Sequence, residues 1–293
     1  MTHTVTRFAP SPTGFLHLGH AYAAIVAYDT AQRNGGRFLL RLEDIDSGRC
    51  KREFEKQILA DLAWLGLTWD KPVRRQSDHL ATYRAALDTL REKGLVYPCF
   101  CTRTEINQEI ARMGVAPHGP DGPNYPGTCR ALPLPERGRL LASGASHAWR
   151  LDTGQALQTG GHNALTFHEQ GCGPNGETGL ITADPARTGD IVLGRKDFGV
   201  SYHLAVTMDD HLAGVTLVTR GADLFGATHV QRLLQALLGL DTPRYAHHKL
   251  ICDDTGRRLA KRDKDKTLKS LRESGAGPQD IRAMLGLTSP ANH

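Results

Sequence analysis

The 293-residue sequence has no long apolar run, and no apolar segment follows a basic stretch near its N-terminus. No stretch approaches the roughly 18 uninterrupted apolar residues of a membrane-spanning helix, so we expect neither a membrane span nor a secretory signal. Internal repeats and low-complexity tracts are also lacking. The six cysteines are irregularly spaced, which suits a reducing compartment, where metal binding is commoner than disulfide formation. The sequence therefore indicates a cytoplasmic protein with no membrane partner.

Apolar residues make up 40% of the chain and the net charge is +5. The length is enough for one large α/β domain with an insertion, or for two domains. Basic residues gather between positions 244 and 273, where ten Lys and Arg face five Asp and Glu. Such a run is usually a solvated face, but beside a nucleotide site it also suits pyrophosphate or an RNA backbone.

A loop at residues 10–20, PSPTGFLHLGH, follows a short apolar strand predicted at Val5–Phe8. Its two prolines cannot donate to a sheet, and its two glycines allow the backbone to approach a ligand. From Ala21, small and apolar residues recur at helical spacing until Gly35 and Gly36, which favour a helix end. The loop is therefore predicted to join a strand to a helix.

His17 and His20 lie at this strand-to-helix transition. A helix N-terminus offers unpaired N–H groups and a positive dipole end to a phosphate, and imidazoles can donate to phosphate oxygens as charge develops. Two solvent-facing histidines on a turn are the alternative, which the proline-glycine frame disfavours. Far downstream, residues 258–262 form a second loop, the basic sequence RLAKR. Together the two loops predict a nucleotide-binding site that activates a carboxylate with ATP.

Strands and helices alternate along the first hundred residues, with a strand at 37–43 and helices near 49–65 and 79–93. This alternation is typical of a parallel sheet wound with helices. From about residue 99 to 180 the chain is rich in Pro and Gly and weakly periodic, which indicates an insertion. The βα pattern resumes at 189–193 and 202–208, interpreted as strands, before a helix near 228–238.

Three cysteines, Cys99, Cys101 and Cys129, belong to this insertion. Three thiolates and one further ligand would complete a tetrahedral structural zinc site. The fourth ligand could be Tyr125 or His118, and imidazole is the commoner ligand on general grounds. Three buried, reduced cysteines without metal are the alternative, but a metal would supply the core that this aliphatic-poor segment lacks.

These segments resemble the signatures of class I aminoacyl-tRNA synthetases in their glutamyl-specific form. Residues 7–20 resemble the first signature and 258–262 the second, and RLEDID at 41–46, MDDH at 208–211 and TRGADL at 219–224 also match. The resemblance covers nearly the whole chain in the right order. It implies an α/β fold, a Rossmann-type parallel sheet with an inserted zinc-binding subdomain of the acceptor-binding type.

The resemblance divides the chain into four parts. Residues 1–98 are expected to form the first half of the nucleotide-binding catalytic domain, 99–188 the inserted zinc-binding subdomain, 189–243 the second half of the catalytic domain, and 244–293 the second-signature loop with a short helical remnant. A standard glutamyl-tRNA synthetase continues into a helical anticodon-binding portion, whereas about thirty residues follow Arg262. No anticodon-binding domain is therefore expected.

Charge complementarity indicates how glutamate would be held, since it carries two carboxylates and one ammonium group. The planar fork of arginine binds both oxygens of a carboxylate, and Arg7 and Arg220 flank strand ends, where pockets form in open α/β sheets. Glu43 can receive the ammonium group. The resemblance carries the glutamate-binding positions onto Arg7, Phe8, Ala9, Pro10, Ser11, Glu43, Tyr202 and Arg220.

The mechanism implied by the resemblance is a two-step acyl transfer. The substrate carboxylate attacks the α-phosphate of ATP, bound with Mg²⁺, and positioning and electrostatic stabilisation carry the rate. His17 and His20 would stabilise the phosphates and Lys261 the leaving pyrophosphate. Arg258 and Ala260 stand where the second signature usually has lysine and serine, and a missing hydroxyl contact costs roughly 1 kcal/mol. Activity is still expected because Lys261 is present.

The resemblance is closest to truncated paralogues, the glutamyl-queuosine tRNA(Asp) synthetases, whose zinc sites are closed by tyrosine and so favour Tyr125. It implies a monomeric ligase that activates L-glutamate without tRNA and attaches it to the queuosine of tRNA(Asp). Two alternatives remain open. One is a catalytic fragment of a glutamyl-tRNA synthetase that charges the tRNA 3′ end, and the other is a non-catalytic, zinc-stabilised tRNA-binding module.

Overall fold

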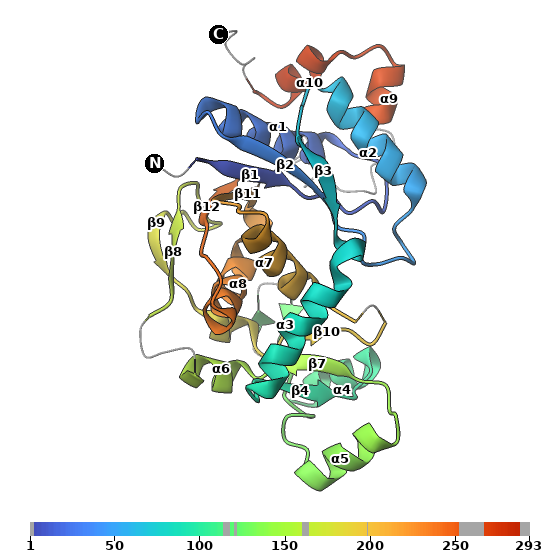
Figure 1. The fold of residues 1–293 in the computed structure, drawn as a ribbon, viewed down its shortest axis with the longest axis vertical. Helices are drawn as coiled ribbons and strands as arrows, with labels where there is room; N and C mark the ends of the chain where they lie inside the picture. Colours follow the sequence, from blue (N-terminus) through green and yellow to red (C-terminus); the bar gives the residue numbers. More distant parts are fainter. Residues whose placement is uncertain are drawn as a thin grey trace.

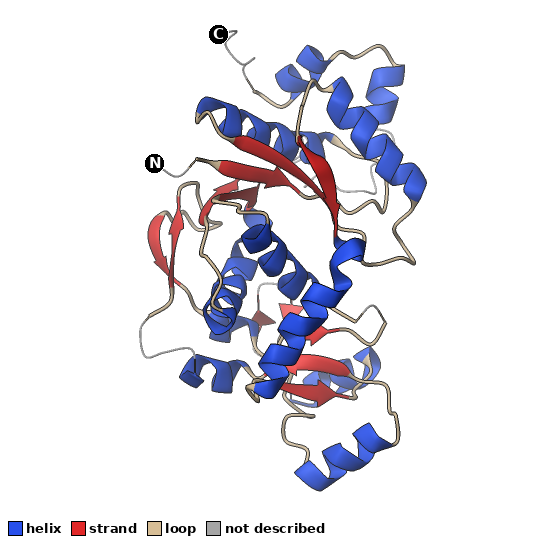
Figure 2. Ribbon diagram, in the orientation of Figure 1, coloured by secondary structure: helices blue, strands red, loops and turns tan. Residues whose placement is uncertain are grey.

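The computed structural model describes residues 3–113, 118–119, 122–159, 164–197, 199–251 and 267–287. Within these ranges, no helix combines the length and hydropathy that crossing a membrane requires. Figure 1 shows the chain from its N-terminal sheet to an extended lower part built from the middle of the sequence, and Figure 2 shows the mixed helix and strand content.

The first part of the main sheet has the order β1-β2-β3 and is parallel throughout. It comprises β1 (Val5–Phe8), β2 (Arg37–Leu42) and β3 (Asp70–Arg75). Every residue of β1 is buried, as is usual for a parallel strand covered by helices on its faces. The strands predicted at 5–8 and 37–43 are confirmed.

The second part has the order β11-β12-β8-β9. The strands β11 (Leu217–Gly221) and β12 (Arg244–His248) are parallel, and a hairpin of β8 (Thr166–Glu169) and β9 (Gly179–Thr182) extends them. The Thr216 N–H donates to the Val5 carbonyl oxygen at 3.0 Å. This bond places β11 beside β1, so the two parts are neighbours.

Helices follow the strands and pack against them. The helices α1 (Leu18–Arg33) and α2 (Arg52–Trp64) follow β1 and β2, and α3 (Leu80–Glu92) leads toward the insertion. The helices α7 (Tyr202–Leu212) and α8 (Phe225–Leu238) pack on each other. Residues 202–208 belong to α7, so the prediction of a strand there is wrong. The residues of a buried helix can be apolar on every side, and such a run has no period that distinguishes it from a buried strand.

The region that contains the insertion, residues 96–194, carries its own antiparallel sheet, in the order β10-β7-β4. In Figure 1 it occupies the lower part of the molecule, with α5 farthest from α1. Its strands are β4 (Val96–Cys99), β7 (Ala148–Leu151) and β10 (Val192–Gly194), and its helices are α4 (Arg103–Met113), α5 (Leu134–Ala142) and α6 (Thr153–Thr159). Short elements are η1 (Gln76–His79), β5 (His118–Gly119), β6 (Gly122–Pro123), η2 (Pro185–Thr188) and η3 (Ala222–Leu224).

Two C-terminal helices, α9 (Leu268–Glu273) and α10 (Pro278–Met284), complete the core around α1 and α2. Leu268 and Ile281 are fully buried in the cluster that also holds residues of α1 and α2. Arg282 donates from both terminal nitrogens to the two carboxylate oxygens of Asp29 on α1, at 2.8 Å each. This segment is thus part of the core that α1 and α2 form.

Ile281→Ala should lower the free energy of unfolding by about 2–5 kcal/mol, because it leaves a cavity in a fully packed core. Met284, on the same helix, is 55% exposed, so Met284→Ala serves as the matched control and should change stability little. Urea denaturation followed by circular dichroism measures both. Equal losses for the two variants would contradict the placement of α10.

Candidate active site

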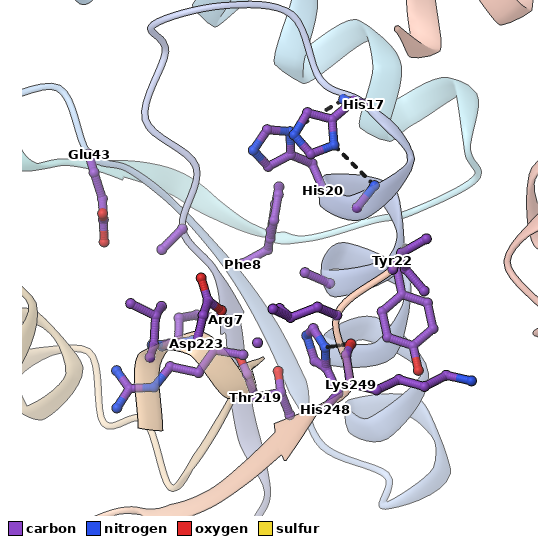
Figure 3. Close-up of a pocket in the computed structure, with 18 of the residues that line it drawn as sticks. Arg7, Phe8, His17, His20, Tyr22, Glu43, Thr219, Asp223, His248 and Lys249 are labelled. Atoms are coloured by element: carbon purple, nitrogen blue, oxygen red, sulfur yellow. Dashed lines mark hydrogen bonds between the residues drawn. The ribbon is translucent and has the colours of Figure 1, made fainter. Parts of the chain in front are cut away.

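A cavity of about 550 Å³ opens where β1, β2, β11 and β12 end and α1 begins. Carboxyl ends of parallel strands are the usual place for ligands in open α/β sheets. Figure 3 shows side chains from these elements converging on the cavity. The predicted residues that line it are Arg7, Phe8, Ala9, His17, His20, Glu43, Tyr202 and Arg220.

Pro10 and Ser11 do not line this cavity in the structure. The Ser11 side chain is exposed, and the Pro10 carbonyl oxygen accepts the Glu43 N–H at 3.0 Å. Pro10 therefore ties the ends of β1 and β2 together. Lys261, with Arg258 and Ala260, lies outside the described residues, but Ile251 lines the cavity and Thr267 forms a β-bridge with His17.

His17 and His20 cap the N-terminus of α1 with their ring nitrogens. His17 Nδ1 accepts the Gly19 N–H at 3.1 Å, and His20 Nδ1 accepts the His17 N–H at 3.3 Å. The rings lie 3.8 Å apart between centroids. Since Nδ1 of each ring is an acceptor, each neutral ring carries its proton on Nε2. The two imidazoles are thus held as hydrogen-bond donors beside the helix N-terminus.

Arg7 is fixed by Asp210 on α7. Its Nε donates to Asp210 Oδ1 at 3.0 Å, Nη2 to Oδ2 at 3.3 Å, and Nη1 to the Thr219 carbonyl oxygen at 3.1 Å. Arg41 also donates to Asp210, at 2.6 Å. Burial alone would raise the pKa of Asp210, but the two guanidinium groups outweigh it and hold that pKa at about 2. The cluster therefore keeps Asp210 ionised.

Glu43 extends this cluster toward the cavity. Arg41 donates to Glu43 Oε1 at 3.2 Å, and burial raises the pKa of Glu43 despite the opposing effects of Arg41 and Arg7. A partly buried carboxylate beside the cavity is suited to an ammonium group. Tyr202, at the start of α7, is 37% exposed and lines the same cavity.

Arg220 has different partners from Arg7. It is buried at the end of β11 and donates to His247 Nε2 at 3.1 Å, Gln231 Oε1 at 2.9 Å and Thr228 Oγ1 at 2.7 Å. None of these is a carboxylate, and within the described residues no ion pair involves Arg220. A buried cation that lines a cavity in this state favours an anionic ligand.

Several residues of the site were not predicted from the sequence. Arg41 holds Asp210 and Glu43, and His247 holds Arg220. His248 and Lys249 line the cavity, with the His248 ring edge-on to Tyr22. The sequence signal that could have identified His247, His248 and Lys249 is the end of the strand at 244–248, because parallel strands end at a common edge of the sheet, where ligands bind.

The cysteine cluster of the insertion is assembled as predicted. The sulfurs of Cys99, Cys101 and Cys129 lie within 4.8 Å of one another, and the Tyr125 hydroxyl lies 3.4 Å from Cys99 Sγ and 3.5 Å from Cys101 Sγ. Tetrahedral zinc with bonds of about 2.3 Å needs ligand atoms about 3.8 Å apart. The donor set therefore fits a metal ion, while the His118 side chain lies outside the described residues.

The thiols also have a defined electrostatic setting. A hydrogen bond from the Cys99 thiol lowers the pKa of Cys129 to about 6, and the same bond together with burial raises the pKa of Cys99 to about 12. The Phe100 N–H donates to Cys129 Sγ at 3.3 Å. Lys196, from the loop after β10, donates to the carbonyl oxygens of Phe100 and Cys101, which joins the cluster to the rest of the chain.

Asp210→Asn should lower the free energy of unfolding at neutral pH by about 3–5 kcal/mol, because the buried Arg7 loses its carboxylate partner and the buried Arg41 loses one of its partners. In the wild type, a depressed pKa means that this stabilisation is present above pH about 4 and lost as the pH falls toward about 2. The variant should lack that part of the acid sensitivity. Urea denaturation at several pH values tests this, with Asp88→Asn, at an exposed pair with Arg91, as control. Equal stabilities of the two variants would refute it.

The tRNA synthetase class I (E and Q) catalytic domain model matches residues 3–290. A glutamyl-Q tRNA(Asp) synthetase of Rhodobacter capsulatus is 52% identical over 285 residues, covering 97% of this chain and all of that protein. One from Deinococcus radiodurans is 43% identical, covering 98% of this chain and 90% of that protein.

A solved structure, a glutamate tRNA ligase from Elizabethkingia meningosepticum in complex with its amino acid, aligns with a TM-score of 0.79 at 28% identity. The alignment covers 99% of this chain and 62% of that chain. The two folds therefore agree over nearly the whole length of this chain. The chain belongs to the class I tRNA synthetases of the glutamate and glutamine group and, within that group, to the glutamyl-Q tRNA(Asp) synthetases.

Proposed function

We propose that this chain activates L-glutamate with ATP, without requiring tRNA, and transfers the resulting glutamyl group to the queuosine of tRNA(Asp). The observation that carries this proposal is the composition of one cavity. A buried arginine without a carboxylate partner, Arg220, and a cavity-lining carboxylate, Glu43, stand at one end, and two imidazoles that can donate hydrogen bonds from Nε2 stand at the other. The family membership gives the reaction class.

Glutamate would bind with its three charges matched to this cavity. The side-chain carboxylate meets Arg220, since the other cavity arginine, Arg7, is already bidentate with Asp210. The ammonium group meets Glu43, and Tyr202 borders the same space. The α-carboxylate is then left toward His17 and His20, where the phosphates of ATP are expected.

In the first step an α-carboxylate oxygen attacks the α-phosphorus of Mg-ATP, the bond to the bridging oxygen of the β-phosphate breaks, and pyrophosphate leaves. His17 and His20 donate hydrogen bonds from Nε2 to the phosphate oxygens and exchange no proton, because their Nδ1 atoms accept backbone N–H groups. Lys261 is assigned to the leaving pyrophosphate. In the second step a queuosine hydroxyl oxygen attacks the adenylate carbonyl carbon, the bond between that carbon and the AMP phosphate oxygen breaks, and AMP leaves while its phosphate takes up the hydroxyl proton.

The acceptor is proposed to reach the adenylate from the insertion side. A second cavity of about 810 Å³ lies between α4, β7 and the start of α7, and Tyr202 lines both cavities. Its basic side chains exceed its acidic ones, and such a surface attracts an RNA backbone. The basic residues are Arg103, Arg150, Arg195 and Lys196, and the acidic ones Asp190 and Asp197.

The metal of the insertion is proposed to be one structural Zn²⁺ per chain, held by Cys99, Cys101, Tyr125 and Cys129. Zinc prefers thiolates in closed, four-coordinate structural sites, and it would fix the insertion without taking part in the reaction. Reduced thiols suit the cytoplasm, where we place the enzyme. We propose that it works as a monomer, since one chain supplies both ends of the cavity.

ATP–pyrophosphate exchange tests the proposed activity. The purified protein should catalyse exchange with glutamate in the absence of tRNA, and neither aspartate nor glutamine should replace glutamate, because aspartate is too short to span the cavity and glutamine lacks the second carboxylate. Labelled glutamate should then be transferred to tRNA(Asp) that contains queuosine and not to queuosine-free tRNA(Asp). Exchange that requires tRNA would contradict the proposal and support a glutamyl-tRNA synthetase fragment that charges the 3′ end. The absence of any exchange would contradict it in favour of a non-catalytic tRNA-binding module.

Metal analysis tests the zinc site. The wild type and Cys172→Ser, which alters an exposed cysteine outside the cluster, should each hold one zinc ion per chain after dialysis. Cys129→Ser should lose the zinc ion during dialysis. Tyr125→Phe should give up its zinc ion to a chelator that is too weak to remove zinc from the wild type. Zinc retention by Tyr125→Phe together with its loss from His118→Asn would make His118 the fourth ligand.

A further inference from the structure

Arg220 is held by hydrogen bonds that leave part of its guanidinium group for a ligand. The group has five N–H donors, and Nε, Nη1 and Nη2 each use one, on His247, Gln231 and Thr228. Two N–H donors remain, one on each terminal nitrogen, and the residue lines the cavity while only 5% exposed. The orientation of this fork depends on the acceptor opposite Nε.

That acceptor, His247, is fixed from its other side by Glu169. Glu169 Oε2 lies 2.6 Å from His247 Nδ1, and both side chains are fully buried. Glu169 Oε1 accepts the backbone N–H groups of His247 and Gly171, at 2.9 and 2.8 Å. An ionised carboxylate can only accept, so His247 carries a proton on Nδ1. Its Nε2 then presents a lone pair to Arg220.

The surroundings of His247 keep its imidazole neutral and fix its orientation. Burial lowers the pKa of His247, and the Glu169 hydrogen bond, which acts in the opposite direction, does not offset it. The ring stacks parallel to Tyr245 and edge-on to Phe225. A Cβ added at Gly171 would lie 2.2 Å from the His247 carbonyl oxygen, so the β8–β9 turn is in close contact with β12. The ring has little room to rotate.

We propose that Glu169 and His247 are positioning residues that orient the Arg220 guanidinium group for the carboxylate of the substrate. This inference rests on the proposed activation of glutamate. In the series Glu169–His247–Arg220, the negative charge nearest to Arg220 is that of Glu169, and the His247 imidazole lies between them. Arg7, in contrast, contacts the carboxylate of Asp210 directly. The series thereby stabilises Arg220 in the buried site without placing a carboxylate in direct contact with it. The carboxylate of the substrate can then be the direct anionic partner of Arg220.

Glu169→Gln tests the series because it is nearly isosteric and reverses one hydrogen bond. If the glutamine oxygen keeps the two backbone N–H groups, its amide faces His247 Nδ1 as a donor. The ring proton then moves to Nε2, where it meets the Arg220 Nε–H, so two donors oppose each other. We expect the KM for glutamate in ATP–pyrophosphate exchange to rise about 10- to 100-fold, with the KM for ATP unchanged and kcat at saturating glutamate largely kept.

The tautomer gives a second readout that a merely structural role would not move. In protein labelled with ¹⁵N-histidine, His247, assigned by the signals that vanish in His247→Gln, should be protonated at Nδ1 in the wild type and at Nε2 in Glu169→Gln. Glu177→Gln is the matched control, because this carboxylate, in the same β8–β9 turn, accepts hydrogen bonds from Asn175. It should leave both the tautomer and the KM for glutamate unchanged.

The proposal is overturned if wild-type His247 is protonated at Nε2 at neutral pH, or if a folded Glu169→Gln variant keeps the wild-type KM for glutamate. Should Glu169→Gln not fold, the wild-type spectrum alone decides. Failure of the proposed function is seen separately, as a wild-type protein that shows no glutamate-dependent exchange.

Discussion

Two adjacent aspartates on α7 hold the ends of three neighbouring strands. Asp210 accepts from Arg7 on β1 and Arg41 on β2, and Asp209 accepts from Arg74 on β3. Buried charges are tolerated when each has a partner and are costly when one is removed. The pairing therefore fixes the strand ends relative to α7, and the cavity, with Tyr202 at its rim, takes its shape from that arrangement.

Periodicity was a sufficient guide wherever an element has one buried face or a clear end. The strand at 5–8, the helix that starts after the first-signature loop and the helices near 49–65 and 79–93 could all be predicted in this way. The helix at 202–212 could not, because its residues from 204 to 207 are all buried and show no alternation. Pairing of β10 with β7, across the expected end of the insertion, was equally invisible to local pattern.

The residues of the site divide in the same way. His17, His20, Glu43 and Arg220 stand in motifs whose spacing is local, and the cavity brings them together. Their supports are distant in sequence: Asp210 lies 203 residues from Arg7, and the partner of His247 lies 78 residues before it. No local pattern carries such contacts. The roles of the individual residues therefore depend on the tertiary arrangement.

The imidazoles of the first-signature loop carry two duties on one ring, capping the helix through Nδ1 and facing the cavity as donors. A lysine would offer a cation without an acceptor, and an aspartate an acceptor without a donor. Asparagine and glutamine are the remaining side chains that place both on one planar group, and glutamine reaches farther at the cost of one more rotatable bond. Evolutionary replacement at positions 17 and 20 is thus confined by helix capping as much as by chemistry, and the range of residues tolerated there should be narrower than catalysis alone would demand.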